Sequence, residues 1–123
     1  MNVIVTDAGF GTDTWDGDIL DLASDTDPAN VDLAAAPAMI RVDFPSFADG
    51  RGFTIARRLR LAGYTGQLRA KGHVIADQYA MARRSGFDEV EIDNDLAERQ
   101  PESQWTFRAN WQAHDYQSRL RVG

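Results

Sequence analysis

Residues 38–92 carry the pattern that decides the fold, and they read AMIRVDFPSFADGRGFTIARRLRLAGYTGQLRAKGHVIADQYAMARRSGFDEVEI. Three short apolar runs have the length and composition of buried strands, at residues 38–44, 67–71 and 89–92. The two segments between them have apolar residues at helical spacing, at residues 52–62 and 74–84. Each of these segments ends at a glycine followed by an aromatic residue, which is typical of a helix C-cap. Alternating strands and helices with short links predict an α/β domain with a small, mostly parallel sheet built on a βαβαβ unit.

The flanking segments have weaker patterns. Residues 3–6 predict one added N-terminal strand, followed by Asp- and Gly-rich loops or a hairpin up to about residue 26. Asp27 before Pro28 predicts the start of a short helix that runs to about Ala36. A further helix is expected to begin at Pro101, and the tail 113–123 is expected to be ordered only through Tyr116.

Length and composition fit one soluble domain over residues 1–123. The chain is 43% hydrophobic and 26% charged, which are ordinary globular values. It has no apolar run long enough to span a membrane and no signal-peptide pattern, so we expect a cytoplasmic protein without membrane contact. The absence of cysteine excludes a thiol nucleophile and Cys-ligated metal centres within this chain. We expect no bound metal and no cofactor, because no nucleotide, flavin or calcium-loop motif is present.

Charge is distributed unevenly along the chain. The Asp-rich N-terminal part, residues 1–40, holds eight Asp and no Lys or Arg, whereas residues 41–123 hold all 13 basic residues against 11 acidic ones. The net charge of −6 argues against general nucleic-acid binding, which needs a basic face. The basic part can still bind a small oxyanion or phosphate.

The links that follow the first two central strands are the candidate site. In a parallel sheet, the loops at the C-terminal ends of the strands lie on one edge, and both links lead into helix N-termini, which favour anions. This edge is expected to collect Asp49, Gly50, Arg51, Gly52, Arg69, Lys71, Gly72 and His73. The alternative is that Asp49 caps the following helix and Arg51 pairs with Asp49 or with an acidic residue of the N-terminal part.

Two residues are candidates for acid–base chemistry. Asp77, in the first turn of the second helix, and His73 could face the same edge and act as catalytic groups. The alternative for Asp77 is that it only complements the helix dipole. The aromatic residues near the C-terminus are expected to form core or an oligomer contact, and they are Trp105, Phe107, Trp111 and Tyr116.

The central residues resemble a known family. The matching motifs are Phe44-Pro45-x-Phe47-x-Asp49-Gly50-Arg51, Leu59-Arg60, Gly63-Tyr64-x-Gly66-x-Leu68-Arg69-Ala70, Gly72-x-Val74 with Asp77-Gln78, and Arg84-x-Gly86-Phe87-Asp88. Over residues 42–92 the chain resembles a bacterial family of unknown function whose members are often labelled as oxidoreductases involved in sulfite reduction. By matching position, the resemblance implies that the signature residues are Asp49, Gly50, Arg51, Arg69, Asp77, Gln78 and Arg84.

The resemblance implies an association with sulfite reductase or other sulfate-assimilation proteins, without implying a particular reaction. Ser85 stands where the family commonly has Cys, so a Cys-dependent redox role cannot apply here. His73 also departs from the acidic or amide residue that is usual at its position.

Three functional hypotheses follow. The first is an accessory or oxidoreductase-associated factor of assimilatory sulfite or sulfate reduction, which binds a small oxyanion or docks on the reductase. The second is a small enzyme acting on a phosphorylated or sulfated metabolite, with Asp77 or His73 as acid or base. The third is a non-catalytic protein-interaction domain that uses the Asp-rich N-terminal part as its contact surface. A homo-oligomer is a separate expectation about the partners of this chain.

Overall fold

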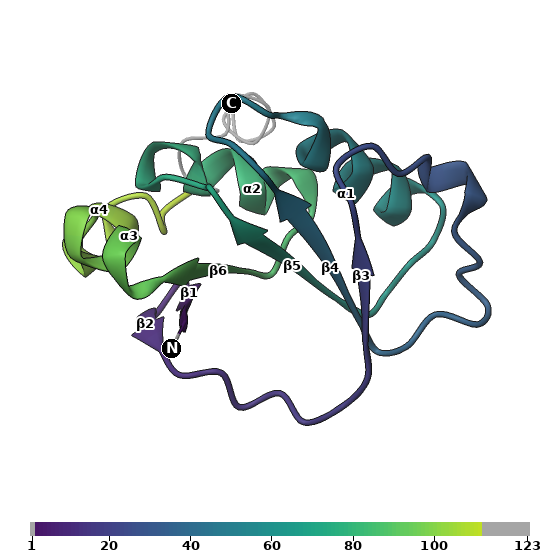
Figure 1. Ribbon diagram of the computed structural model, residues 1–123, viewed down its shortest axis with the longest axis horizontal. Coiled ribbons are helices and arrows are strands. Elements are labelled where there is room, and N and C mark those ends of the chain that lie inside the picture. The colour runs from purple at the N-terminus through teal and green to yellow at the C-terminus, as the bar shows by residue number, and fades with distance from the viewer. Residues whose placement is uncertain (1, 112–123) are drawn as a thin grey trace, which may run out of the picture.

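A computed structural model describes residues 2–111 of the chain, and its centre is one six-stranded sheet with the strand order β2-β1-β6-β5-β4-β3 (Figure 1). The strands are β1 (Asn2–Thr6), β2 (Gly9–Gly11), β3 (Ile19–Leu22), β4 (Met39–Phe44), β5 (Gln67–Gly72) and β6 (Glu89–Asp93). The helices are α1 (Arg51–Leu61), α2 (Tyr79–Ser85), α3 (Asn94–Arg99) and α4 (Glu102–Thr106), with 3₁₀ turns η1 (Pro28–Asn30) and η2 (Ala76–Gln78).

The pairing confirms the predicted fold class. Strands β3, β4, β5 and β6 run parallel to one another, and β1 pairs antiparallel with both β6 and β2. The chain therefore has a mostly parallel sheet built on βαβαβ, with an N-terminal hairpin added beside β6. None of the helices among residues 2–111 is long and apolar enough to span a membrane.

Alternate residues of each strand divide the sheet into two unlike faces. Ile40 and Val42 of β4, Leu68 of β5 and Val90 of β6 are fully buried in the hydrophobic core beneath α1 and α2 (Figure 1). The residues between them are charged and point to the other side, which we call the open face. Within residues 2–111 no helix covers this face, and the link 12–18 between β2 and β3 passes along it. Parallel sheets usually have both faces covered, so the charged side chains of this uncovered face need partners from one another or from the link 12–18.

The expected helix from Asp27 to Ala36 is wrong. Only the single turn η1 forms, because Val31 has extended backbone and the Asp32 carboxylate accepts a hydrogen bond from the Ala34 N–H at 3.1 Å. The chain therefore makes two successive Asp-capped turns there. Their apolar side chains Val31, Leu33 and Ala36 pack against the core, which offsets the loss of helical hydrogen bonds.

Other differences from the sequence expectations are local. Residues 19–22, expected to lie in loops or a hairpin, form β3 beside β4, because this four-residue apolar segment gains its hydrogen bonds only from the neighbouring strand. The second central helix begins as η2, and α3 follows β6 directly through the Asp93 cap on Leu96 N–H at 2.8 Å. Trp105 is fully buried, as expected for a core aromatic, while Tyr116 and the tail 113–123 lie outside the described residues.

Candidate functional site

At the start of α1, Arg51 is paired with a carboxylate of the protein itself, that of Asp49. Asp49 accepts hydrogen bonds from the backbone N–H of Arg51 at 3.1 Å, from its Nε at 3.0 Å and from its Nη2 at 2.8 Å. The Arg51 guanidinium holds the pKa of Asp49 well below its ordinary range, and Arg51 Nη2 also donates to Ser24 Oγ at 2.9 Å. This is the pairing that the sequence analysis gave as the alternative to an anion site at Arg51.

The two glycines of this loop have different roles. Gly50 is the N-cap residue of α1 and is exposed. A Cβ at Gly52 would lie 2.4 Å from the Phe44 ring, so this position requires glycine for close packing of α1 on β4. Neither glycine's environment in itself indicates a bound anion.

Arg69 does not lie with Arg51 at the strand ends. Its side chain is 2% exposed on the open face, where Nε contacts Glu89 at 2.8 Å and Nη1 contacts Glu91 at 3.0 Å. Asp13, from the link 12–18, closes the cluster by accepting from Nη1 and Nη2, each at 3.1 Å. Arg69 is therefore surrounded by three carboxylates, and it fastens the link 12–18 to the sheet.

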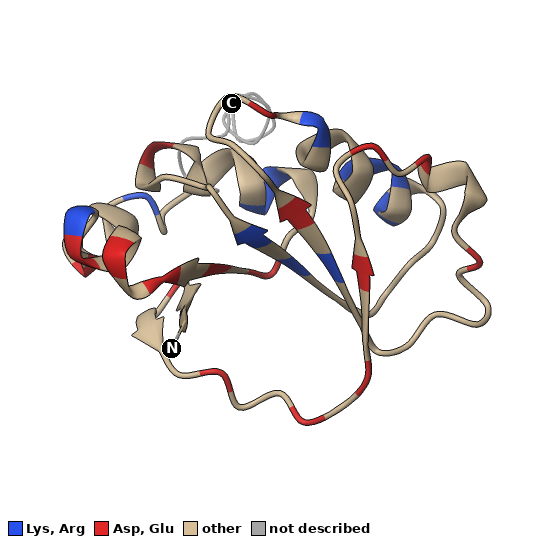
Figure 2. Cartoon of the chain, in the orientation of Figure 1, with Lys and Arg blue, Asp and Glu red and all other residues tan. Residues whose placement is uncertain are grey.

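The ion pairs continue across the open face towards β3. Arg41 donates from Nη1 to Glu91 at 3.1 Å and from Nε to Asp21 at 2.5 Å. Glu91 also accepts from Asn2 Nδ2 at 2.7 Å. Burial alone raises the pKa of Glu91, but the hydrogen bond from Asn2 and the nearby arginines more than offset this, and its pKa is lowered. On the open face, the basic residues Arg69 and Arg41 thus lie on the neighbouring strands β5 and β4, and acidic residues lie on the flanking strands β6 and β3 (Figure 2).

A cavity of about 270 Å³ lies at the C-terminal ends of β5 and β6. Three residues with basic side chains line it, and they are Lys71, His73 and Arg99. Its two acidic lining residues already have partners: Glu91 contacts arginines, and Asp93 caps α3. Lys71 lies between Asp43 and Glu91 in the sheet register, yet no carboxylate of residues 2–111 approaches it within ion-pair distance. The cavity therefore contains a cation that has not been neutralised by a direct contact.

The link after β5 orients His73 at this cavity. Gly72 has φ +116°, and a Cβ there would lie 2.7 Å from the carbonyl oxygen of Phe44, so the tight turn requires glycine. His73 places Nδ1 3.2 Å from the same oxygen, and its ring packs edge-on against Phe47 with 5.0 Å between centroids. When Nδ1 donates to that oxygen, Nε2 is the ring nitrogen that can contact a ligand.

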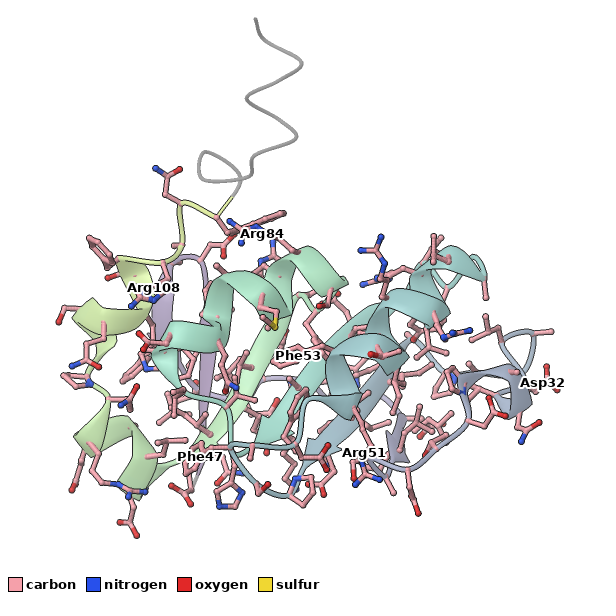
Figure 3. The ribbon with its side chains drawn as sticks, turned by 90° about the horizontal axis from the view of Figure 1, so that it is seen from above. Asp32, Phe47, Arg51, Phe53, Arg84 and Arg108 are labelled. Atoms are coloured by element: carbon pink, nitrogen blue, oxygen red, sulfur yellow. The ribbon has the colours of Figure 1, made fainter. Side chains whose placement is uncertain are left out.

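The second helix start does not contribute to the cavity. Asp77 is exposed, forms an ion pair with Arg108 and is not among the lining residues. Gln78 accepts a hydrogen bond from Ile75 N–H at 3.1 Å and donates to the Phe47 carbonyl at 3.2 Å, which ties the loop after β4 to η2. Seen from above the helices, Phe47 and Arg51 lie along one side of the molecule, whereas Arg84 lies on the opposite side (Figure 3).

Arg84, the last signature residue, also contacts backbone. Its Nη2 donates to the carbonyl of Trp111 at 3.1 Å.

Among residues 2–111, no three His, Asp or Glu side chains are grouped so that they could hold a metal ion. Of the predicted site residues, the structure brings together Lys71, Gly72 and His73, and it places Asp49 with Arg51 in a separate cluster.

Sequence reasoning named Arg60 only as part of a family motif, without a role, and it missed the cavity residue Arg99. Arg60 donates to Gly86 O at 3.0 Å, to Tyr64 O at 2.9 Å, to Gly66 O at 2.7 Å and to Asp88 at 2.9 Å. It joins the two glycine–aromatic turns that end α1 and α2. The repetition of these turns in the sequence predicts two similar helix ends, but it does not predict that one side chain contacts both of them. Arg99 has no such signal, because α3 itself was not predicted.

Comparison with known proteins gives one result. No curated protein and no solved structure matches the chain. A family model matches residues 19–121, which include the four parallel strands and the four helices. This match covers most of the chain and includes the segment over which the sequence resemblance was recognised. The chain therefore belongs to the family described as bacterial protein of unknown function (DUF934).

Proposed function

We propose that this protein is an accessory factor of assimilatory sulfite or sulfate reduction that binds a small oxyanion in the Lys71–His73 cavity. The pathway is suggested by the sequence resemblance over residues 42–92. The binding site is suggested by one observation: among residues 2–111, Lys71 is the basic residue of the open face without a carboxylate in direct contact.

The charges around the cavity support an anionic ligand. Arg41 and Arg69 are each paired with carboxylates, so their charge is largely cancelled before a ligand arrives. Lys71 keeps its charge beside His73, which can add a donor, and beside Arg99 at the rim. A volume of about 270 Å³ exceeds that of a four-oxygen anion, so it can also accept part of an ester or ordered waters.

The test is a thermal-unfolding series with sulfite, sulfate, phosphate and adenylyl sulfate. A ligand at about 100 times its Kd adds roughly 2.7 kcal/mol to the free energy of unfolding. Sulfate and phosphate also stabilise proteins by exclusion from their surfaces, so the diagnostic quantity is the difference between wild type and Lys71→Met. We expect one anion to raise the Tm of the wild type by several degrees more than that of the variant.

Arg51→Ala is the matched control. It removes a cation from the other predicted anion site, whose carboxylate partner remains, and we expect it to keep the full response to the ligand. A response lost in Arg51→Ala but retained in Lys71→Met would move the site to the start of α1. Equal responses in all three proteins would refute specific binding in the cavity.

The partner half of the proposal has its own test. An accessory factor that docks on sulfite reductase should copurify with the reductase holoenzyme, and Lys71→Met should leave this association unchanged if ligand binding and docking use different surfaces. No association with the reductase under any salt condition would contradict the docking role.

The enzyme alternative now depends on His73. Asp77 is paired with Arg108 outside the cavity, so His73 is the only predicted acid–base residue that a bound ester would meet. An enzyme predicts that His73→Gln binds the ligand but loses turnover. A pure binding role predicts no turnover of phosphate or sulfate esters by the wild type.

A further inference from the structure

A second cavity, of about 510 Å³, lies between β3 and the link that joins β3 to β4. We call it the β3 groove. Leu20 and Leu22 line it on the strand side, and Val31, Ala36 and Pro37 line it on the link side. The link passes outside β3, at the edge of the sheet (Figure 1). The groove shares no lining residue with the cavity proposed for the anion, and the following argument is independent of the proposed function.

The link side of the groove is fixed by contacts within the chain. The Tyr64 hydroxyl donates to the Pro37 carbonyl at 2.8 Å, and the Asp27 carboxylate caps η1 by accepting from the Ala29 N–H at 3.0 Å. Apolar side chains of the link pack against the hydrophobic core. Because these contacts set the shape of the groove, a segment can bind there with little rearrangement of the protein.

The strand side of the groove is an open sheet edge. β3 is the last strand in the order β2-β1-β6-β5-β4-β3, and among residues 2–111 it pairs with β4 alone. Within the same residues, the link makes no backbone hydrogen bond with β3. The outer edge of β3 therefore presents backbone donors and acceptors without a strand partner. Such an edge can accept an extended segment as an additional strand.

An added strand would direct every second side chain into the groove. Leu20 and Leu22 lie in register with core residues of β4, so the helix-covered face of β3 is also the face that lines the groove. Asp21 lies between them and contacts Arg41 on the open face. Because side chains alternate along a strand, residues i and i+2 of the added segment would enter the groove, and the residues between them would point to the open face.

Two carboxylates at the rim of the groove favour a cation. Asp27 and Asp32 line the groove, and both are exposed. No Lys or Arg of residues 2–111 forms an ion pair with either. A lysine or arginine side chain fits both surfaces, because its apolar stem packs on the leucines while its charged end reaches a rim carboxylate. The side chains that enter the groove therefore also carry the positive charge.

The charge around β3 favours a partner other than a second copy of this chain. Residues 1–40 hold eight Asp and no Lys or Arg, so two copies meeting at this edge would bring like charges together. We propose that the β3 groove binds an extended segment of a partner protein that has lysine or arginine at two alternate positions. The segment pairs with the edge of β3 as an added strand, and its two cations contact Asp27 and Asp32.

The test measures binding of a fluorescent peptide, acetyl-Thr-Lys-Thr-Lys-Thr-amide, to the full chain by fluorescence anisotropy. We expect binding that weakens with salt, because exposed charges are screened. Asp27→Asn with Asp32→Asn should weaken binding about tenfold or more, because Asn preserves both backbone caps while removing the charge. The matched control is Asp95→Asn with Glu98→Gln, which neutralises two exposed carboxylates of α3 and should leave binding unchanged.

Peptide variants separate the parts of the contact. A peptide with Glu in place of each lysine should not bind the wild type, but it should bind Asp27→Lys with Asp32→Lys. Methionine in place of lysine keeps the stem without the charge, and diaminopropionic acid keeps the charge on a short stem. Each of these should bind about tenfold more weakly or worse. N-methylation of one alternate set of peptide nitrogens should prevent binding, and N-methylation of the other set should not, because only one set faces β3.

Four results would overturn the proposal. The first is a lysine peptide that does not bind the wild-type chain, and the second is full affinity for Asp27→Asn with Asp32→Asn. The third is equal binding of the two N-methylated peptides, which would exclude strand pairing. The fourth is a dimer of the wild-type chain that the peptide dissociates, because the occupant of the groove would then be a second copy.

Discussion

Replacing Arg69 with Ala is the perturbation whose cost follows most directly from the structure. The Arg69 side chain is 2% exposed, and it contacts Glu89 at 2.8 Å, Glu91 at 3.0 Å and Asp13 at 3.1 Å. Glu89 and Glu91 have side chains that are 16% and 6% exposed, so water cannot fully replace the lost guanidinium. The variant would leave two poorly solvated carboxylates on the same face of β6, at alternate positions of the strand.

Breaking a buried ion pair by removing one partner costs about 3–5 kcal/mol. Glu91 keeps Arg41 at 3.1 Å and Asn2 at 2.7 Å, which limits the loss. Asp13 is 36% exposed and can regain water. We therefore expect the lower half of that range, about 3–4 kcal/mol, which corresponds to a Tm decrease of roughly 10–15 °C for a domain of this size.

Urea unfolding followed by circular dichroism measures this loss, with Arg57→Ala, on the exposed face of α1, as the matched control. A second variant separates charge from packing: Arg69→Met with Glu89→Gln and Glu91→Gln keeps similar volume without the unpaired charges. It should recover more than half of the loss, because neutral side chains cost less to bury than unpaired carboxylates. If Arg69→Ala unfolds within about 1 kcal/mol of the wild type, the carboxylates do not depend on Arg69 and the reasoning is refuted.

Three further outcomes are expected. Gly52→Ala should lose about 1–3 kcal/mol in urea unfolding, because its Cβ would lie 2.4 Å from the Phe44 ring, and an unchanged midpoint would contradict this. Arg60→Lys should lose about 2 kcal/mol, since one ammonium cannot replace a guanidinium that contacts three carbonyls and a carboxylate. Contacts with arginine lower the folded-state pKa of Asp13, and hydrogen bonding and arginines lower that of Glu91 despite its burial, so the stability they provide is present above the ordinary pKa of about 4. That stability should be lost as the pH falls below this value, and a Tm that stays flat from neutral to acid pH would argue against it.

The central βαβαβ unit could be predicted because local and tertiary preferences agree there. The runs 38–44, 67–71 and 89–92 correspond to β4, β5 and β6 with boundaries that differ by one residue. Glycine C-caps at the ends of α1 and α2 carry their own conformational signal. β3 could not be predicted in the same way, because four residues have no periodicity to speak of and become a strand only when β4 lies beside them.

The side chains of the candidate site also fall into two groups, those whose position the sequence could predict and those whose position it could not. Lys71, Gly72 and His73 are adjacent in sequence and follow one strand, so their joint position at the strand end could be expected. Arg69 lies two residues earlier on the same strand, but its partners are distant in sequence, so its contacts could not be predicted from the sequence. Glu89 and Glu91 lie on the neighbouring strand, and Asp13 lies 56 residues away on a link that crosses the open face.

The sequence by itself determined the parallel α/β core and the uneven distribution of charge, because periodicity and capping act over a few residues. Tertiary structure alone decided which charges cancel. Carboxylates of β6, of the link 12–18 and of the loop before α1 neutralise Arg69, Arg41 and Arg51, while Lys71 has no such contact among residues 2–111. The physical reason is range: an ion pair forms within about 4 Å in space, and the sheet brings together residues that the chain keeps far apart.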